Sequence, residues 1–385
     1  KIDSIANYAV DRMITPGMQI LVARKGKVIY QESFGNHTYE KEASKVKNTD
    51  LYDIASLTKI IGTLPNVMLE FDKGNLKLDT KLKNMLPVFE DSNKQDATVL
   101  DMLTHQARFQ PWIPFYKATL DSINRPSIKY YRNRGSIEFK LKVADNLYLR
   151  TDYNDTIIKI IAASDLLPKK QYKYSDFPFI LFKEYLEKEN GKSLDFIAKN
   201  NFYNALGATT LTYNPLLQFN KSVIIPTEND TYYRHQIIQG YVHDMAAAMQ
   251  GGVSGHAGLF SNALDVAKVM QMYLQKGSYG GKEYIKEETI QKFNTCYFCK
   301  EGNRRGVGFD KPQLGTEGPT CGCVSLTSFG HTGFTGGMTW ADPDKEIVYV
   351  FLSNRTFPDS NASNKLSKEN IRENIQKVIY ESIIE

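Results

Sequence analysis

Ser56 and Lys59 are the two residues whose types and spacing point most directly to chemistry. Residues three apart share one face of a helix, so a helix that opens at Ser56 would bring the hydroxyl and the amine together. A serine hydroxyl is a weak nucleophile until a base takes its proton. Burial lowers the pKa of a lysine, and its neutral amine can then be that base. The free N–H groups at the start of the helix would suit an oxyanion.

The residues that follow Ser56 predict a helix packed against a core. Apolar side chains recur at helical spacing; they are Leu57, Ile60, Ile61, Leu64, Met68 and Phe71. We expect Pro65 to kink this helix and Gly74 to end it. The pattern Ser-x-x-Lys is weak by itself, because a second copy, Ser44 with Lys47, lies in a polar stretch without an apolar stripe. We interpret that second copy as a solvated loop.

A second polar cluster, Tyr174 and Asp176, stands at the head of the apolar run Phe179–Tyr185. A phenol beside a cationic lysine has a lowered pKa and can transfer a proton. The alternative interpretation is a capping serine or aspartate beside a packed tyrosine, since caps of this type are frequent.

A third cluster is the glycine-rich stretch Phe329–Gly337, which contains His331. Glycines just before a strand allow a substrate to lie against the backbone of a sheet edge. His331 could orient a proton or hold a carboxylate. The alternative is an ordinary glycine-rich turn.

Composition narrows the class of protein. The 385 residues are 42% hydrophobic and 24% charged, with a net charge of +5, as in an ordinary globular protein. The mild charge, without a long basic run, argues against nucleic-acid binding. No apolar run is long enough to span a bilayer. The sequence shows no signal peptide and starts at Lys1 instead of Met, so we expect a processed or trimmed chain.

The four cysteines are confined to one segment, as Cys296 and Cys299 followed by Cys321 and Cys323. Two disulfides, a zinc site and free thiols are all compatible with these spacings, although the second pair is tighter than in most zinc ribbons.

The pattern of strands and helices predicts one α+β domain over residues 1–385. Strand-like runs near both chain ends predict a single antiparallel sheet; they are Met18–Ala23, Val28–Phe34, Gly337–Ala341 and Ile347–Ser353. Residues 1–74 and 326–385 would form this sheet and its flanking helices, and residues 75–325 a mostly helical subdomain with insertions. Helices are expected at Lys1–Met13, Val99–Thr104, Asp195–Leu206, Ala263–Gln275 and Ser363–Ile384. Residues 107–172 are expected to be an insertion over a cleft between the two layers.

Taken in order, the three clusters resemble the signatures of serine β-lactamases and penicillin-binding proteins, closest to the class C-like branch, whose second motif starts with tyrosine. His331 stands where β-lactamases usually carry lysine, and Asp176 where asparagine is usual. With these two residues and the stretches Tyr241–Asp244 and Gly255–Ser261, the chain resembles the exo-acting N-acetylmuramyl-L-alanine amidases. In the Bacteroidetes branch such domains are often joined behind a family 3 N-acetylglucosaminidase. The stretch Asn303–Pro312 resembles that branch.

The resemblance implies a role for each residue. Ser56 would be the nucleophile, Lys59 and Tyr174 would share proton transfer, and Asp176 and His331 would orient them. The N–H groups of Ser56 and Phe334 would form the oxyanion hole. Further substrate-binding candidates are Gly333, Phe334, His243, Asp244, His256 and Arg305, although a buried histidine is more often bonded to its surroundings than functional. No cofactor and no metal are implied, and the location would be the periplasm or cell envelope of a bacterium.

Three functions remain to be weighed. The first is an amidase that cleaves N-acetylmuramyl-L-alanine bonds in peptidoglycan turnover, acting on a small muropeptide. The second is an esterase or a D-amino-acid peptidase with a β-lactamase-like site. The third, of another class, is a non-catalytic cell-wall-binding sensor. The presence of Ser56, Lys59 and Tyr174 argues against the third, because a site that has lost its activity usually loses one of its reactive groups.

Overall fold

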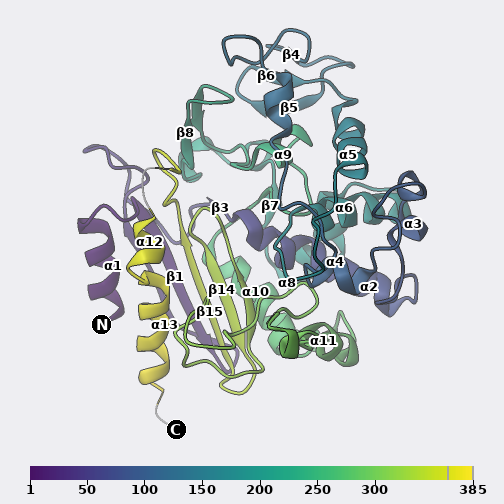
Figure 1. Ribbon diagram of the computed structural model, residues 1–385. Helices are drawn as coiled ribbons and strands as arrows, with labels where there is room; N and C mark the ends of the chain where they lie inside the picture. Colours follow the sequence, from purple (N-terminus) through teal and green to yellow (C-terminus); the bar gives the residue numbers. More distant parts are fainter. Residues whose placement is uncertain (362–363, 384–385) are drawn as a thin grey trace.

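The computed structural model describes residues 1–361 and 364–383. Its largest sheet has five antiparallel strands in the order β13-β14-β15-β1-β2 (Figure 1). The strands are β13 (Phe329–Thr332), β14 (Met338–Asp342), β15 (Ile347–Ser353), β1 (Gly17–Arg24) and β2 (Lys27–Gly35). The α+β fold, with a sheet built from both ends of the chain, is therefore confirmed.

The two hairpins of this sheet form as predicted. Lys25 and Gly26 connect β1 to β2, and both have positive φ, 51° and 73°. Such a two-residue turn matches the twist of the strands it joins. Strands β1 and β15 pair antiparallel from Met18 with Ser353 to Arg24 with Ile347, which joins the two ends of the chain.

Alternating side chains of the sheet pack against helices on both faces. On one face, Ile20 and Tyr349 belong to the core under α1 (Ile2–Asp11) and α13 (Ile371–Glu381). On the other, Leu21 and Val350 belong to the larger core, which includes α10 (Ala263–Leu274). Successive residues of a strand point to opposite faces, so one strand can serve both cores. Figure 1 shows these helices on the two sides of the sheet.

The predicted closing helix is divided. A short helix, α12 (Lys365–Lys368), precedes α13, and Asn370 between them has a left-handed backbone (φ 51°) that interrupts the helical path. The expected end points Ser363 and Ile384 lie outside the described residues.

The region between the sheet halves contains most of the remaining helices and several short strands. The principal helices are α2 (Leu64–Asp72), α3 (Leu82–Met85), α4 (Val99–Leu103), α5 (Tyr153–Ala163), α6 (Phe177–Asn190), α7 (Leu194–Ala198), α8 (Asn204–Leu206), α9 (Met245–Met249) and α11 (Glu287–Asn294). The small sheets are β3 (Tyr52–Asp53) with β10 (Leu259–Ser261) and β7 (Thr212–Tyr213); β4 (Tyr131–Arg132) with β6 (Leu147–Leu149) and β5 (Leu141–Ala144); β8 (Glu228–Asp230) with β9 (Gln236–Ile238); and β11 (Ser278–Tyr279) with β12 (Lys282–Glu283).

The helix expected after Ser56 consists of three different helical segments. A 3₁₀ turn over Ala55–Leu57 leads into a π-helical turn over Lys59–Thr63, and only then does α2 begin. Pro65 was expected to kink the middle of an α-helix. It instead stands in the first turn of α2, directly after the π-helical turn, and the carbonyl oxygens of Ile60 and Ile61 in that turn accept hydrogen bonds from the hydroxyls of Tyr273 and Tyr203. Gly74 follows the end of α2 with φ 83°, as predicted.

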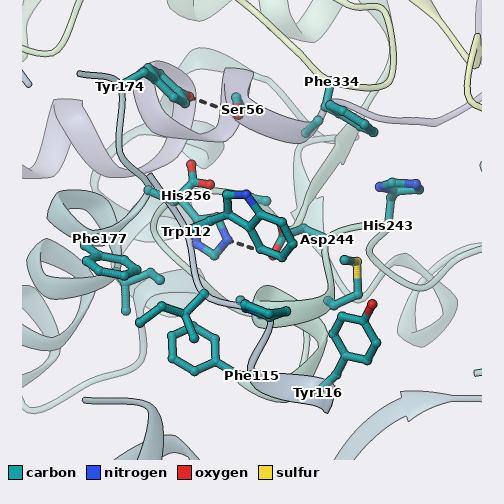
Figure 2. A pocket seen from close by; sticks show the side chains of 18 residues that line it. Ser56, Trp112, Phe115, Tyr116, Tyr174, Phe177, His243, Asp244, His256 and Phe334 are labelled. Carbon is teal, nitrogen blue, oxygen red and sulfur yellow. Dashed lines mark hydrogen bonds and ion pairs between the residues drawn. The ribbon is translucent and has the colours of Figure 1, made fainter. Parts of the chain in front are cut away.

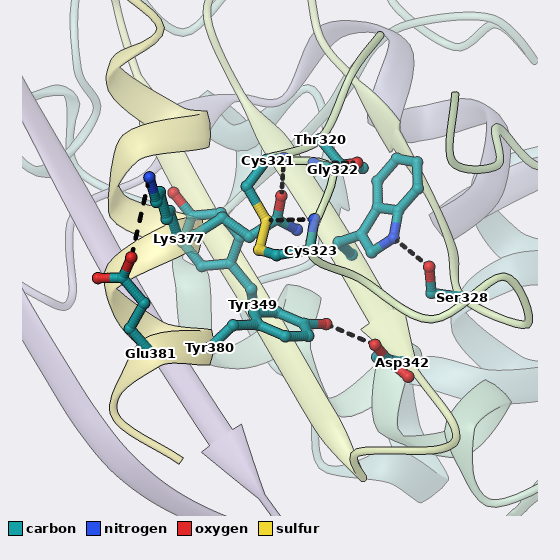
Figure 3. Close-up of a disulfide and its surroundings, with 12 residues drawn as sticks. Thr320, Cys321, Gly322, Cys323, Ser328, Asp342, Tyr349, Lys377, Tyr380 and Glu381 are labelled. Carbon is teal, nitrogen blue, oxygen red and sulfur yellow. Dashed lines mark hydrogen bonds and ion pairs between the residues drawn. A yellow bond between two sulfur atoms is a disulfide. The ribbon is translucent and has the colours of Figure 1, made fainter. Parts of the chain in front are cut away.

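The cysteines form two disulfides, Cys296–Cys299 and Cys321–Cys323. The second lies beside α13, where the backbone N–H of Cys321 donates to the side chain of Gln376 (Figure 3). Of the three alternatives that the cysteine spacings left open, the structure therefore has the two disulfides. Among the described residues, no helix is both long and apolar enough to cross a membrane.

Candidate active site

Strand β3 and the 333–335 loop fix the backbone around Ser56. The buried carboxylate of Asp53 accepts hydrogen bonds from the N–H groups of Ala55, at 2.8 Å, and His243, at 2.6 Å. These bonds support Ala55 in a left-handed conformation (φ 46°) immediately before Ser56. The hydroxyl of Thr335 donates to the backbone oxygen of Asp53 at 2.8 Å. The loop after β13 is thereby tied to the segment that carries the serine.

Ser56 lies between two potential proton carriers. Lys59 Nζ is 2.9 Å from Ser56 Oγ, and the hydroxyl of Tyr174 is 3.2 Å from the same oxygen. The ammonium of Lys59 is fully buried and also contacts the backbone oxygen of His256 at 3.0 Å and Asp176 Oδ1 at 2.7 Å. Four of the residues predicted to be catalytic therefore form one contiguous cluster.

The electrostatics of this cluster differ from the sequence-based expectation. Burial lowers the pKa of Lys59, but the neighbouring Asp176 carboxylate outweighs it, so the pKa lies above its ordinary value. Burial likewise raises the pKa of the Tyr174 phenol, despite the opposing charge of Lys59. The expected lowering of both pKa values was wrong, because the sequence did not reveal the 2.7 Å ion pair or the depth of burial. Both shifts favour the ammonium form of Lys59 and the neutral phenol of Tyr174.

His331 is neutral and lies behind Tyr174. Burial, with the nearby cations Arg305 and Lys59, holds the pKa of His331 well below its ordinary value. Its Nδ1 is 2.7 Å from the backbone oxygen of Thr332. A carbonyl oxygen only accepts, so Nδ1 carries the hydrogen and Nε2 is a bare acceptor, which has no hydrogen-bond partner among the described residues. The rings of His331 and Tyr174 are 5.9 Å apart.

His105 positions Tyr174 and was not singled out as a site residue. Its Nδ1 accepts from the N–H of Ser175 at 3.3 Å, and its backbone oxygen accepts from Lys173 at 2.9 Å. The rings of His105 and Tyr174 are 4.7 Å apart. His105 thus contacts the residues on both sides of Tyr174 and the phenol ring itself. Its sequence signal was its place at the end of the stretch Asp101–His105, just after the apolar helical turn α4.

Ser56 opens into a cavity of about 340 Å³. Figure 2 shows Ser56, Tyr174 and Phe334 at one end and Phe115, Tyr116 and Phe177 at the other. The remaining lining residues are Ala55, Trp112, Ile113, Pro114, Asp176, Ile180, His243, Asp244, Met245, Ala246, His256 and Ala257. The segment 112–116, within the insertion expected to cover the cleft, forms part of the wall.

The predicted substrate-binding residues divide into two groups. Phe334, His243, Asp244 and His256 line the cavity. Gly333 lies against the segment before Ser56, where a Cβ atom would come within 2.9 Å of the Ile54 carbonyl oxygen.

Arg305 is not among the lining residues, since it is only 5% exposed and its guanidinium lies 5.3 Å from the centre of the Tyr174 ring. It also contacts the Tyr172 hydroxyl at 3.1 Å. These contacts place Arg305 behind Tyr174 and not at the cavity surface.

Three potential metal donors lie close together in the cavity wall, Asp176, Asp244 and His256. Each is already engaged. Asp176 pairs with Lys59, and His256 Nε2 is 2.7 Å from Asp244 while its Nδ1 is 2.8 Å from the Ser254 hydroxyl. The ammonium of Lys59 would repel a cation bound there. This donor set therefore fits a metal ion poorly.

His243 belongs to a separate pair. Its Nε2 lies 3.0 Å from a carboxylate oxygen of the buried Glu228, an ion-pair distance without hydrogen-bond geometry. On its other side, the His243 ring is 5.4 Å from that of Phe334. The pair supports the wall next to Phe334.

Comparison with known proteins agrees with this geometry. A family model described as beta-lactamase matches residues 5–370. An Escherichia coli K12 protein named "Putative D-alanyl-D-alanine carboxypeptidase" is 30% identical over 366 residues, which cover 88% of this chain and 78% of that protein.

Solved structures share the fold at lower identity. EstCE1, described as a hydrolase with promiscuous acyltransferase activity, superposes with a TM-score of 0.70 and 16% identity, over 98% of this chain and 97% of its own. The octameric penicillin-binding protein homologue from Pyrococcus abyssi gives a TM-score of 0.66 and 20% identity, over 98% and 78%. The chain belongs to the β-lactamase family and is a serine hydrolase with the fold of penicillin-binding proteins.

Proposed function

We propose that the protein hydrolyses its substrate through an acyl-enzyme on Ser56. The observation that carries this proposal is the placement of Ser56 Oγ between Lys59 Nζ and the Tyr174 hydroxyl, facing a cavity. Serine nucleophiles need an adjacent base, and this geometry provides a candidate base and a candidate acid. The same cluster opposes the non-catalytic sensor, because no reactive group of the three motifs is missing.

In the proposed mechanism, Ser56 attacks the carbonyl carbon and passes its proton to the neutral amine of Lys59. The N–H groups of Ser56 and Phe334 hold the oxyanion. Tyr174 gives its proton to the leaving group, and a water molecule then releases the acyl group with the same residues acting in reverse. Asp176 controls the first step, since its carboxylate favours the ammonium form of Lys59. The rate should therefore increase with pH as Lys59 loses its proton.

For the substrate we propose the amide bond between the lactyl group of N-acetylmuramic acid and L-alanine. Support comes from the Tyr174-Ser175-Asp176 and His331-Thr332-Gly333 motifs, which resemble those of such amidases, within a chain of the β-lactamase family. A cell-envelope location and a fusion behind a family 3 glucosaminidase would suit this substrate, because such a partner would remove the preceding sugar.

The test is incubation with muramyl dipeptide, with free N-acetylmuramic acid as the expected product. Ser56→Ala is the control and should release none. If simple esters are hydrolysed and N-acetylmuramic acid is not released, the amidase proposal is wrong.

A second candidate is a D-amino-acid carboxypeptidase, which the names of the relatives favour. It would release D-alanine from a peptide ending in D-alanyl-D-alanine. Measurement of free D-alanine with both substrates decides between the two functions.

A further inference from the structure

Two large aromatic side chains that line the cavity are more than half exposed to solvent. Trp112 is 55% exposed and Phe334 is 53% exposed, although both line the cavity beside Ser56. Large apolar groups that remain open to solvent around a concave site commonly mark a ligand surface. We refer to Trp112 and Phe334 as the aromatic rim.

The apolar residues that also line the cavity include Ile113, Phe115, Phe177, Ile180 and Met245. A pocket of about 340 Å³ is at the small end of ligand sites, so it accommodates one ring-sized group and not an extended polymer.

The charges that face the cavity are unfavourable for an anion. None of its lining residues, all within the described part of the chain, is a lysine or an arginine. Asp176 and Asp244 are partly exposed to it, and each is paired at 2.7 Å, with Lys59 and His256 respectively. An anionic group would meet these two carboxylates, and the nearby cations are already engaged: Lys59 pairs with Asp176, and the guanidinium of Arg355 lies 4.8 Å from the centre of the Phe334 ring.

We infer that the aromatic rim binds the acyl half of the substrate and selects an uncharged group with an apolar face. The inference rests on the proposed function in one respect, that Ser56 is acylated. The acyl half must stay bound beside Ser56 while the leaving group departs and water enters, so apolar side chains in the cavity wall are suited to hold it. A pyranose ring and an alkyl chain both present such a face, so experiment must distinguish these two sources.

Selectivity can be measured with p-nitrophenyl esters, which keep the leaving group constant. We expect kcat/KM for the pentanoate to exceed that for the similarly sized succinate half-ester by about 10-fold or more. Trp112→Ala should lower kcat/KM for the pentanoate by about 10-fold and lower that for the acetate by a smaller factor. Trp112→Phe should retain most of the preference.

The matched control is Ile128→Ala, which truncates an apolar side chain that is 85% exposed in the same insertion and should change neither ester. Equal rates for the pentanoate and the succinate would overturn the inference. An equal loss for acetate and pentanoate in Trp112→Ala would also overturn it.

Binding separates the two sources of the acyl group. The chain has two tryptophans, and Trp340 is 1% exposed within the sheet, so a ligand-induced change in fluorescence should report Trp112. In the Ser56→Ala background, muramyl dipeptide is compared with a hexanoyl group on the same dipeptide. A saturable change with muramyl dipeptide would show that the rim binds a sugar ring. A saturable change with the hexanoyl dipeptide alone would show that it binds an alkyl chain. Trp112→Phe should remove the fluorescence change.

No saturable change with either ligand would contradict the inference that the aromatic rim binds the acyl half of the substrate. Retained ester selectivity without release of N-acetylmuramic acid would instead remove only the proposed amidase function.

Discussion

The two sides of the cavity are held in different ways. Ser56 and Lys59 lie on a helical segment whose neighbours are buried, and Asp53, Thr335 and His256 tie it to other elements. The rim residue Trp112 lies on a segment without regular structure, and its side chain is half exposed. In the proposed mechanism the chemistry depends on atoms fixed by many contacts, whereas selection of the acyl group depends on side chains that can change without moving those atoms.

The largest expected effect comes from a change on the Ser56 side of the cavity. Ser56→Ala should lower turnover of any ester or amide by about 10⁴-fold or more, because it removes the nucleophile. The melting temperature should change by no more than about 2 °C, since only one hydroxyl is lost. Turnover assays and thermal denaturation check this result. Retention of more than about 1% of the activity would show that another residue starts the reaction.

Tyr174→Phe should have the next largest effect. It removes the hydroxyl that lies 3.2 Å from Ser56 Oγ and keeps the ring against His105. Loss of one proton-transfer group predicts a decrease in kcat of about 10²- to 10³-fold, with the pentanoate-to-succinate preference unchanged. A decrease of less than about 3-fold would assign proton transfer to Lys59 alone.

Asp176→Asn should move the pH dependence and not the acyl selectivity. Asp176 favours the ammonium form of Lys59, so its loss should lower the pKa of Lys59. The amine then becomes available at lower pH, and the rising part of the kcat/KM profile should shift toward acid. A profile of p-nitrophenyl acetate hydrolysis measures this. A shift toward alkaline pH, or none, would exclude Lys59 as the titrating base.

His105→Asn should have the smallest effect. His105 has a left-handed backbone (φ 57°), which asparagine tolerates better than alanine, so the exchange removes the ring with little strain. Looser positioning of Tyr174 should lower kcat by about 10-fold and leave KM nearly unchanged. Steady-state kinetics test this expectation, and a change confined to KM would contradict a positioning role.

Local patterns were sufficient for the fold but not for the electrostatics of the site. Nearly continuous apolar runs in Met18–Ala23 and Ile347–Ser353 predicted the strands. The runs are continuous because both faces of the sheet are covered. The exposed, non-helical surroundings of Ser44 also agree with the prediction of a solvated loop there. Such features depend on neighbours in the sequence.

The raised pKa of Lys59 and the place of Arg305 depend on contacts between distant segments. Asp176 is more than one hundred positions from Lys59 in the sequence, and no local pattern gives their 2.7 Å separation. Arg305, in the stretch Asn303–Pro312, was predicted to bind substrate, yet its side chain lies behind Tyr174. The irregular segment around Trp112 offered no period from which its place in the cavity wall could be predicted.

Peptide mass spectrometry after treatment with a fluorophosphonate tests the central claim most directly, because the reagent marks an activated serine. We predict one adduct, on the peptide that contains Ser56. It should be absent from Ser56→Ala and unchanged in Ser44→Ala, which alters the other Ser-x-x-Lys pair. An adduct on a different serine, or equal labelling of Ser56→Ala, would contradict the assignment of Ser56 as the nucleophile.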